Sequence, residues 1–356
     1  MSRYLIRRLL QAIPTLFGVS LLSFMIMSAA PGGPLAALSQ DPKMTPAKKA
    51  IRIRQLGLDD PWPLQYVRWL VGDDWRLFDT NGDGKLSTEC KIDEAGKQVC
   101  GPDLYGMSRG ILRGDWGYSY VNRRPVLSLI GERLGATVEL SILSLIIGAS
   151  LGILIGILAA VRRGGVFDNG SRVLSVVLSA VPTFWLGLLL IIVFGGILKV
   201  LPMGSRCSPT APCPPIWGRL EYLFLPVLIL STGGIAGYSR YLRASMLDVI
   251  NQDYVRTARA KGLPDRAVWF VHAARNAMIP LVTFLGPAIA GLLGGAVITE
   301  TLFSWPGLGR LAIQSVNTLD YPLLMAITMI GAVETIAGFM LSDFLYALVD
   351  PRIRLG

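Results

Sequence analysis

Long apolar runs, separated by shorter polar stretches, set the pattern of this chain. Six of the runs reach the roughly 20 residues that an α-helix needs to cross a bilayer core of about 30 Å. They cover residues 9–29, 137–161, 173–200, 223–246, 280–298 and 321–348. The first run is long, rich in Phe and Met and not followed by a small-residue cleavage site, so we expect it to be retained. The pattern predicts an all-α integral membrane protein with six transmembrane helices.

The composition agrees with a membrane protein. The chain is 52% hydrophobic and 16% charged, whereas soluble domains are about a quarter charged. Its net charge of +10 would suggest nucleic acid in a soluble protein. Here much of the positive charge flanks the apolar runs, where anionic lipid and membrane orientation explain it. Because no recognition motif accompanies the charge, we expect membrane lipid and no nucleic acid as a partner.

The basic residues lie on alternate sides of the runs and so indicate an orientation. The basic positions next to the first, second and sixth runs are Arg3, Arg7, Arg8, Arg162, Arg163, Arg172, Arg352 and Arg354. The positive-inside rule then places both termini in the cytoplasm. We divide the chain into residues 1–30, an extracytoplasmic segment at 31–136 and a five-helix core at 137–356 with a basic cytoplasmic loop at about 247–279.

Within that loop, residues 251–276 read as a helix, a stop and a second helix. Tyr254, Ala258 and Lys261 fall on one side at helical spacing. Gly262 can take the left-handed conformation that ends a helix, and Pro264 suits the first turn of the next one. Such a basic hairpin could lie flat on lipid or dock into another protein.

The loop resembles a known family. It reads DYVRTARAKGL and then HAARNAMIP, which is similar to the cytoplasmic loop of ABC-transporter permeases of the dipeptide/oligopeptide family. Further similar motifs follow in order: GDWGYSY from Gly114, TETLFSWPGLGRL at 299–311 and VDPRIR at 349–354. The resemblance covers nearly everything except an insertion at about 74–102.

The resemblance implies the type I ABC importer permease fold and a function. The chain would be the permease subunit of an ATP-driven importer that moves di- or oligopeptides, or peptide-like solutes, across the cytoplasmic (inner) membrane. Its partners would be a second homologous permease, two ATPase subunits and an extracytoplasmic substrate-binding protein. The sequence has no phosphate-binding loop, so ATP and Mg²⁺ would bind the partner subunits. We expect no enzyme activity and no cofactor for transport in this chain.

The family's coupling helix, seated in a groove of the ATPase subunit, would correspond to the segment that ends at the glycine of the 252–276 loop. Its residues are Asp253, Tyr254, Val255, Arg256, Thr257, Ala258, Arg259, Ala260, Lys261 and Gly262.

Two other classes compete with this interpretation. A proton-coupled secondary transporter would use Glu334, the deepest acid in a predicted span, as a relay, but it should also show an internal repeat, and we see no convincing one. We therefore expect Glu334 to face the translocation path or to bond between helices. A membrane enzyme needs a catalytic set such as HExxH or GxSxG, and we expect neither in this chain. The single histidine, His272, we expect to be a packing residue.

The insertion contains a stretch similar to an EF-hand calcium loop. Acidic and amide side chains occupy ligand positions one, three and five, and a glycine provides the turn at six. The candidate ligands are Asp79, Asn81, Asp83, Lys85, Ser87 and Glu89. Position twelve is Cys90 instead of Glu, so the stretch is either a calcium site or an Asn-Gly/Asp-Gly turn in a solvated loop.

The four cysteines all fall in loops assigned to the outside. They form two close pairs in a compartment that favours oxidation. We predict the disulfides Cys90–Cys100 and Cys207–Cys213, with chance placement of free thiols as the alternative.

Overall fold

The computed structural model describes residues 2–30, 53, 58–75, 77–78, 91–92, 98–99, 104–105, 108–208, 210, 212–281, 288–289, 291–292 and 296–349. The chain divides into two compact units, each of which we describe by itself. The first comprises Met1–Ala12, Arg133–Ile313 and Gly331–Gly356. The second comprises Ile13–Glu132 and Gln314–Ile330.

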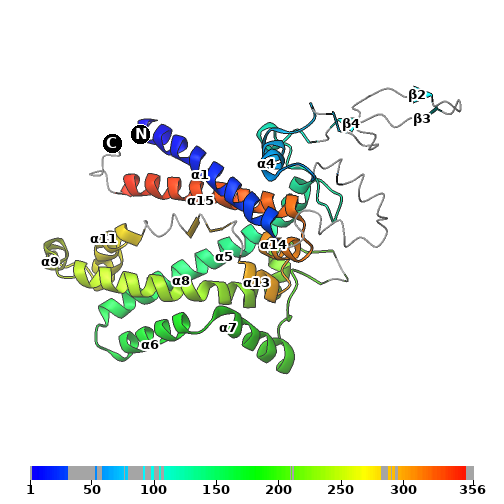
Figure 1. Cartoon of the computed structure of the whole chain (residues 1–356). Helices are drawn as coiled ribbons and strands as arrows, with labels where there is room; N and C mark the ends of the chain where they lie inside the picture. The colour runs from blue at the N-terminus through cyan, green and yellow to red at the C-terminus, as the bar shows by residue number, and fades with distance from the viewer. Residues whose placement is uncertain are drawn as a thin grey trace. The chain divides into compact units, whose positions relative to one another are not determined.

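In the part of the chain that the structure describes, four helices are long and apolar enough to cross a membrane, which makes this a multi-pass membrane protein (Figure 1). They are α1 (Ser2–Ala29), α5 (Val126–Val161), α8 (Leu220–Val249) and α15 (Tyr321–Val349). Each contains one of the predicted spans. The predicted span at 280–298 falls largely outside the described residues, so six spans remain a prediction.

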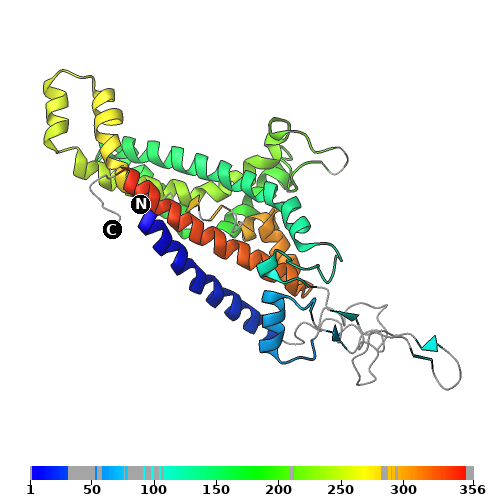
Figure 2. The ribbon, with the colours of Figure 1, turned by 90° about the horizontal axis from the view of Figure 1, so that it is seen from above.

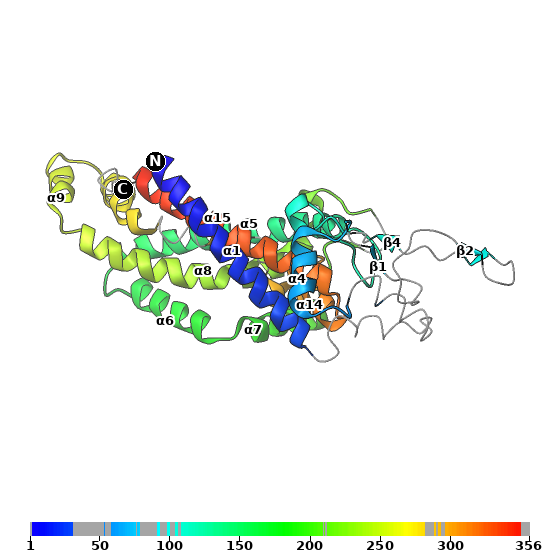
Figure 3. The same cartoon turned by 45° about the horizontal axis from the view of Figure 1, so that its top comes forward.

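The predicted span at 173–200 is not one continuous helix. It is divided into α6 (Val166–Ala180), α7 (Thr183–Leu190) and a π-helical continuation η2 (Ile191–Ile197). Helix α6 and the combined segment of α7 and η2 are bent by 98° relative to each other (Figure 3). The bend lies at Val181 and Pro182: Val181 is extended (φ −80°, ψ 126°), as expected for a residue whose helical conformation would clash with a following proline ring. The apolar composition predicted one span, and the proline overrode it.

Helices α5 and α8 of the first unit approach closely along a row of glycines. Gly148, Gly152 and Gly156 recur every four residues and so share one face of α5. A Cβ at Gly152 would lie 2.8 Å from the Cβ of Tyr238, and one at Gly156 would lie 2.8 Å from the carbonyl oxygen of Ser239. Only glycine allows this approach, as in the small-residue contacts of other membrane helix pairs.

At one end of α5 and α8, a buried apolar cluster joins them to three short helical segments. These are α9 (Asp253–Ala260), η4 (Val268–Ala273) and α11 (Ala274–Ala277), with α10 (Asp265–Ala267) leading into η4. The cluster is formed by Ile157, Ala160, Leu242, Met246, Val255, Ala258, Val268, Ala273, Ala274 and Ala277. Figure 2 shows the hairpin of α9 and η4 projecting beyond the end of α8. The hairpin is therefore packed onto the long helices.

Nearer the start of α5, a turn between α13 (Val297–Leu302) and α14 (Leu308–Asn317) is fixed by buried hydrogen bonds. The Trp305 indole donates to the carbonyl of Ala136 (2.8 Å). The Glu300 carboxylate accepts from the Thr137 hydroxyl (2.8 Å) and from the backbone N–H of Arg310 (3.0 Å). These hydrogen bonds thus hold the motif at 299–311 against α5.

In the second unit, α4 (Trp62–Val71) packs on the later part of α1. The hydroxyls of Ser20 and Tyr66 lie 2.8 Å apart. Arg68 is buried between Asp60 (3.0 Å) and Asp73 (2.6 Å), so its charge is compensated where water is excluded.

Short elements complete the second unit and the loop before α8. They are η1 (Ile111–Arg113), in the second unit, and η3 (Ile216–Arg219), in the first unit.

Polar side chains fix the loops of the second unit. Arg113 donates to the Asp74 carboxylate (2.6 Å), which lowers the pKa of that carboxyl. Asp320 accepts from the Ser119 hydroxyl and from the backbone N–H of Tyr120 (3.0 Å).

Two pairs of two-residue strands are the exception to the all-α expectation in the part of the chain that the structure describes. Strand β1 (Leu77–Phe78) pairs antiparallel with β4 (Leu104–Tyr105). Strand β2 (Lys91–Ile92) pairs with β3 (Gln98–Val99). The two ends of the segment between β1 and β4 therefore lie side by side, as expected for an insertion.

The α5–α8 contact predicts opposite effects for two glycine substitutions in one helix. We expect Gly156→Ala to destabilise the protein by about 1–3 kcal/mol, because the methyl group would overpack a backbone contact. Gly135→Ala is the control: its Cβ would meet no described atom within 4 Å, and alanine favours helix by about 0.5–1 kcal/mol. Thermal unfolding in detergent measures both, and equal melting temperatures would contradict the contact.

Candidate functional site

Helix α9 ends where the sequence predicts. Gly262 has a φ of +73°, in the left-handed region that glycine adopts at low cost. Its N–H donates to the carbonyl of Arg259 (2.9 Å), and the next N–H, of Leu263, donates to that of Ala258 (3.4 Å). These two bonds form a Schellman motif. Pro264 lies at the N-cap of α10, so the helix, stop and second helix are confirmed.

Two side chains attach α9 to the cluster, and the rest of the segment is exposed. Val255 and Ala258 are buried, one helical turn apart. The exposed positions are Asp253, Tyr254, Arg256, Thr257, Arg259, Ala260, Lys261 and Gly262. The stripe predicted from spacing is divided, because Ala258 faces inward while Tyr254 and Lys261 face outward. The free face of α9 is polar and basic.

The second half of the hairpin is also fixed to α9. The Arg259 guanidinium lies 4.3 Å from the centre of the Trp269 ring, a distance suited to a cation–π contact. His272 is exposed, so its expected role as a packing residue is wrong. The indole thus joins α9 to η4, and it also packs against the buried cluster.

A buried ion pair ties α6 to α8. The Asp168 side chain is 1% exposed, and it accepts from the Nε and Nη2 atoms of Arg243 at 2.5 and 2.8 Å. It also accepts from the backbone N–H of Gly164 (2.9 Å). Helix α6 runs beside α8, so the pair joins the start of α6 to the helix that carries α9. Nothing in the local pattern predicts a pair 75 residues apart.

A second charged group lies on α5 itself. The Glu139 carboxylate accepts from Arg206 (2.5 and 3.0 Å) and from Arg219 (2.7 to 3.1 Å). Both arginines belong to the loop before α8. The predicted Cys207–Cys213 disulfide is present in that loop, with a Cα–Cα distance of 5.5 Å.

The remaining predicted site residues are not tested by the described part of the chain. Cys90, Cys100 and the calcium-like stretch at 79–90 lie outside the described residues, so their pairing and metal binding remain predictions. Glu334 lies in α15 and is 9% exposed. Its place in a translocation path also remains a prediction.

The expectation that the chain contains no GxSxG pattern is wrong. Residues 148–152 read Gly-Ala-Ser-Leu-Gly, which matches the GxSxG motif of serine hydrolases. That motif works at a sharp turn between a strand and a helix. Here it lies inside α5, where its glycines serve the contact with α8. The match therefore has no nucleophile elbow.

Comparisons with known proteins agree on one family. The model described as binding-protein-dependent transport system inner membrane component matches residues 152–355, and its N-terminal counterpart matches residues 1–86. The oligopeptide transport system permease protein AppB of Bacillus subtilis (strain 168) is 39% identical over 99% of this chain and 100% of its own length. The dipeptide transport system permease protein DppB of Escherichia coli (strain K12) is 33% identical over 99% of each.

Among solved structures, an inward-facing form of the methionine ABC transporter MetNI is similar, with a TM-score of 0.49 and 15% identity. The match covers 63% of this chain and 97% of that chain.

The Asp168–Arg243 pair predicts an unequal response to single and double substitutions. We expect Asp168→Asn to cost about 1–3 kcal/mol, because it leaves the partly buried arginine without a charged hydrogen-bond partner. Replacing both partners with leucine should cost less, because no buried charge remains. Arg172→Gln is the control, since Arg172 is exposed and 3.8 Å away. Thermal unfolding in detergent decides: if Asp168→Asn unfolds at the same temperature as Arg172→Gln, the pair does not hold α6.

Proposed function

Because the chain belongs to the family of binding-protein-dependent transport system inner membrane components, we propose that it is the permease subunit of an ATP-driven importer of di- or oligopeptides, or of peptide-like solutes. The observation that carries the proposal is similarity along the whole chain to permeases named for oligopeptide and dipeptide transport. A proton-coupled transporter is not favoured by these relatives. The chain would translocate the solute without catalysing a reaction itself, in line with relatives that are named as permeases.

The partners follow from that class of transporter. A substrate-binding protein would deliver the solute, two ATPase subunits would bind ATP and Mg²⁺, and a second homologous permease would complete the path. Six spans in the type I arrangement would cross the cytoplasmic membrane. Both termini and α9 would face the cytoplasm, in line with the positive-inside rule. The Cys207–Cys213 disulfide supports an oxidising compartment on the other side.

We propose α9 as the coupling helix, seated in a groove of an ATPase subunit. Its exposed basic face suits contact with another protein, while Val255 and Ala258 fix it to the cluster. Closure of the ATPases around ATP would carry α9 with them. Because α9 is packed on α5 and α8, the motion would pass to the long helices as a rigid-body shift and open the path outward.

The proposal is tested with the complete transporter in proteoliposomes. We expect ATP to drive uptake of labelled dipeptide. Gly262→Pro should abolish both uptake and peptide-stimulated ATPase activity, because proline fixes φ near −65° and removes the N–H that caps α9. Gly262→Asn is the matched control, since asparagine tolerates the left-handed conformation.

Normal uptake by Gly262→Pro, with unchanged amounts of assembled protein, would contradict α9 as the coupling element. Peptide uptake that persists without the ATPase subunits would contradict the whole assignment.

A further inference from the structure

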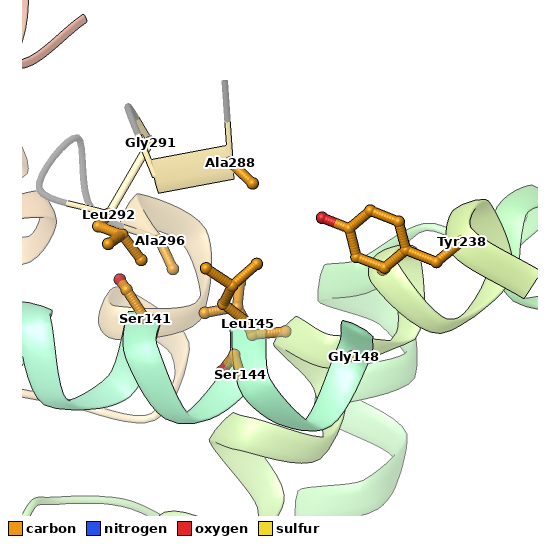
Figure 4. Close-up of a pocket in the computed structure, with 11 residues that line it drawn as sticks. Ser141, Ser144, Leu145, Gly148, Tyr238, Ala288, Gly291, Leu292 and Ala296 are labelled. Atoms are coloured by element: carbon orange, nitrogen blue, oxygen red, sulfur yellow. The ribbon is translucent and has the colours of Figure 1, made fainter. Parts of the chain in front are cut away.

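A cavity of about 270 Å³ opens between the middle parts of α5 and α8 (Figure 4). Its lining includes Ser141, Ser144 and Gly148 on α5, Gly234 and Tyr238 on α8, and Leu292 on a third wall. Ligand pockets in proteins start at roughly 300 Å³. The cavity therefore has room for part of a peptide and not for a whole folded segment.

The cavity lies part-way along α5 and α8. Ser141 is 15 residues after the first residue of α5, Val126, and 20 before the last, Val161. Tyr238 is 18 residues after the start of α8 at Leu220 and 11 before its end. In the predicted span at 137–161, Ser141 is four residues, about 6 Å at 1.5 Å per residue, after the first residue.

Two hydroxyls face the cavity without a partner. Figure 4 shows the Tyr238 hydroxyl directed away from α8 beside Ala288, and the Ser141 hydroxyl directed toward Leu292. Neither side chain takes part in a hydrogen bond in the described part of the chain. By contrast, Ser144 donates to the Leu140 carbonyl (2.7 Å). Neither is among the fully buried side-chain atoms that lack a partner, so both hydroxyls are open to hydrogen bonds with water or solute in the cavity.

The lining also defines what can bind. No described lining residue carries a carboxylate, ammonium, guanidinium or imidazole group. The cavity has nothing to neutralise the charged ends of a peptide, and those charges would be costly to bury there. A neutral amide is different, because it both donates and accepts hydrogen bonds, as a hydroxyl does.

We infer that this cavity binds an uncharged backbone amide of the transported peptide, through Ser141 and Tyr238, during its passage through the membrane. The inference rests on the proposed function. Glycines on both walls leave the space beside the amide open, so the site would tolerate varied side chains. Two walls of the cavity are α5 and α8, the helices onto which α9 is packed. Nucleotide-driven motion of α9 would therefore move the site itself.

The first test measures access to the cavity in the complete reconstituted transporter. A small methanethiosulfonate reagent is applied to Ser141→Cys, with and without an end-blocked neutral dipeptide. Ser128→Cys, exposed on the same helix, is the control, and the unsubstituted chain gives the background. We expect the dipeptide to slow modification at position 141 several-fold and to leave position 128 unchanged.

Equal rates with and without dipeptide would overturn the inference. So would an unreactive Ser141→Cys, because the cavity would then be closed to solutes. If instead the unsubstituted transporter takes up no peptide at all, it is the proposed function that fails.

The second test measures the hydrogen bonds. Tyr238→Phe and Ser141→Ala should each raise the KM for dipeptide uptake about two- to tenfold, the loss of one hydrogen bond. Ser179→Ala, exposed on α6, is the control. An unchanged KM in both variants, with assembly intact by gel filtration, would overturn the inference.

Discussion

The close approach of α5 and α8 is the constraint on which the rest of the first unit depends. Three glycines spaced by four residues let the two backbones touch, and a side chain at Gly152 or Gly156 would force them apart. The apolar cluster extends the same contact to α9, and the Asp168–Arg243 pair extends it to α6. Motion applied to α9 would therefore reach α5, α8 and α6 through these packed contacts.

Charges and hydroxyls have separate roles in this arrangement. The buried acids Glu139, Asp168 and Glu300 each join two or more segments, and each accepts two or more hydrogen bonds from their partners. The cavity between α5 and α8 has only hydroxyls as its polar side chains in the described lining. The charged side chains thus join the helices and loops to one another, whereas the polar side chains that line the cavity are neutral. This separation suits a permease whose cargo varies in charge.

The sequence predicts the local features well. Gly262 as a helix stop, the Cys207–Cys213 disulfide and the long helices α1, α5, α8 and α15 follow from residue types and periodicity. The break at Pro182 was missed because apolar composition alone suggested a continuous span. The buried face of α9 was also missed: spacing cannot say which face a short helix packs inward.

Long-range pairs could not be predicted. Asp168–Arg243 and Glu139–Arg219 join residues 75 and 80 positions apart, and only the packing of the helices brings them together. The glycine row on α5 was a visible signal of close packing, although not of its partner helix. The unpaired hydroxyls of the cavity likewise became apparent only once α5 and α8 were placed side by side.

The central claim is that α9 moves with α8 as one body. The most direct measurement is the distance between spin labels at Thr257 on α9 and Leu220 at the start of α8, both exposed, in the complete transporter. The account predicts the same narrow distance distribution without nucleotide and with ATP trapped. A distribution that shifts or broadens when ATP binds would show that α9 moves independently of α8, and would contradict it.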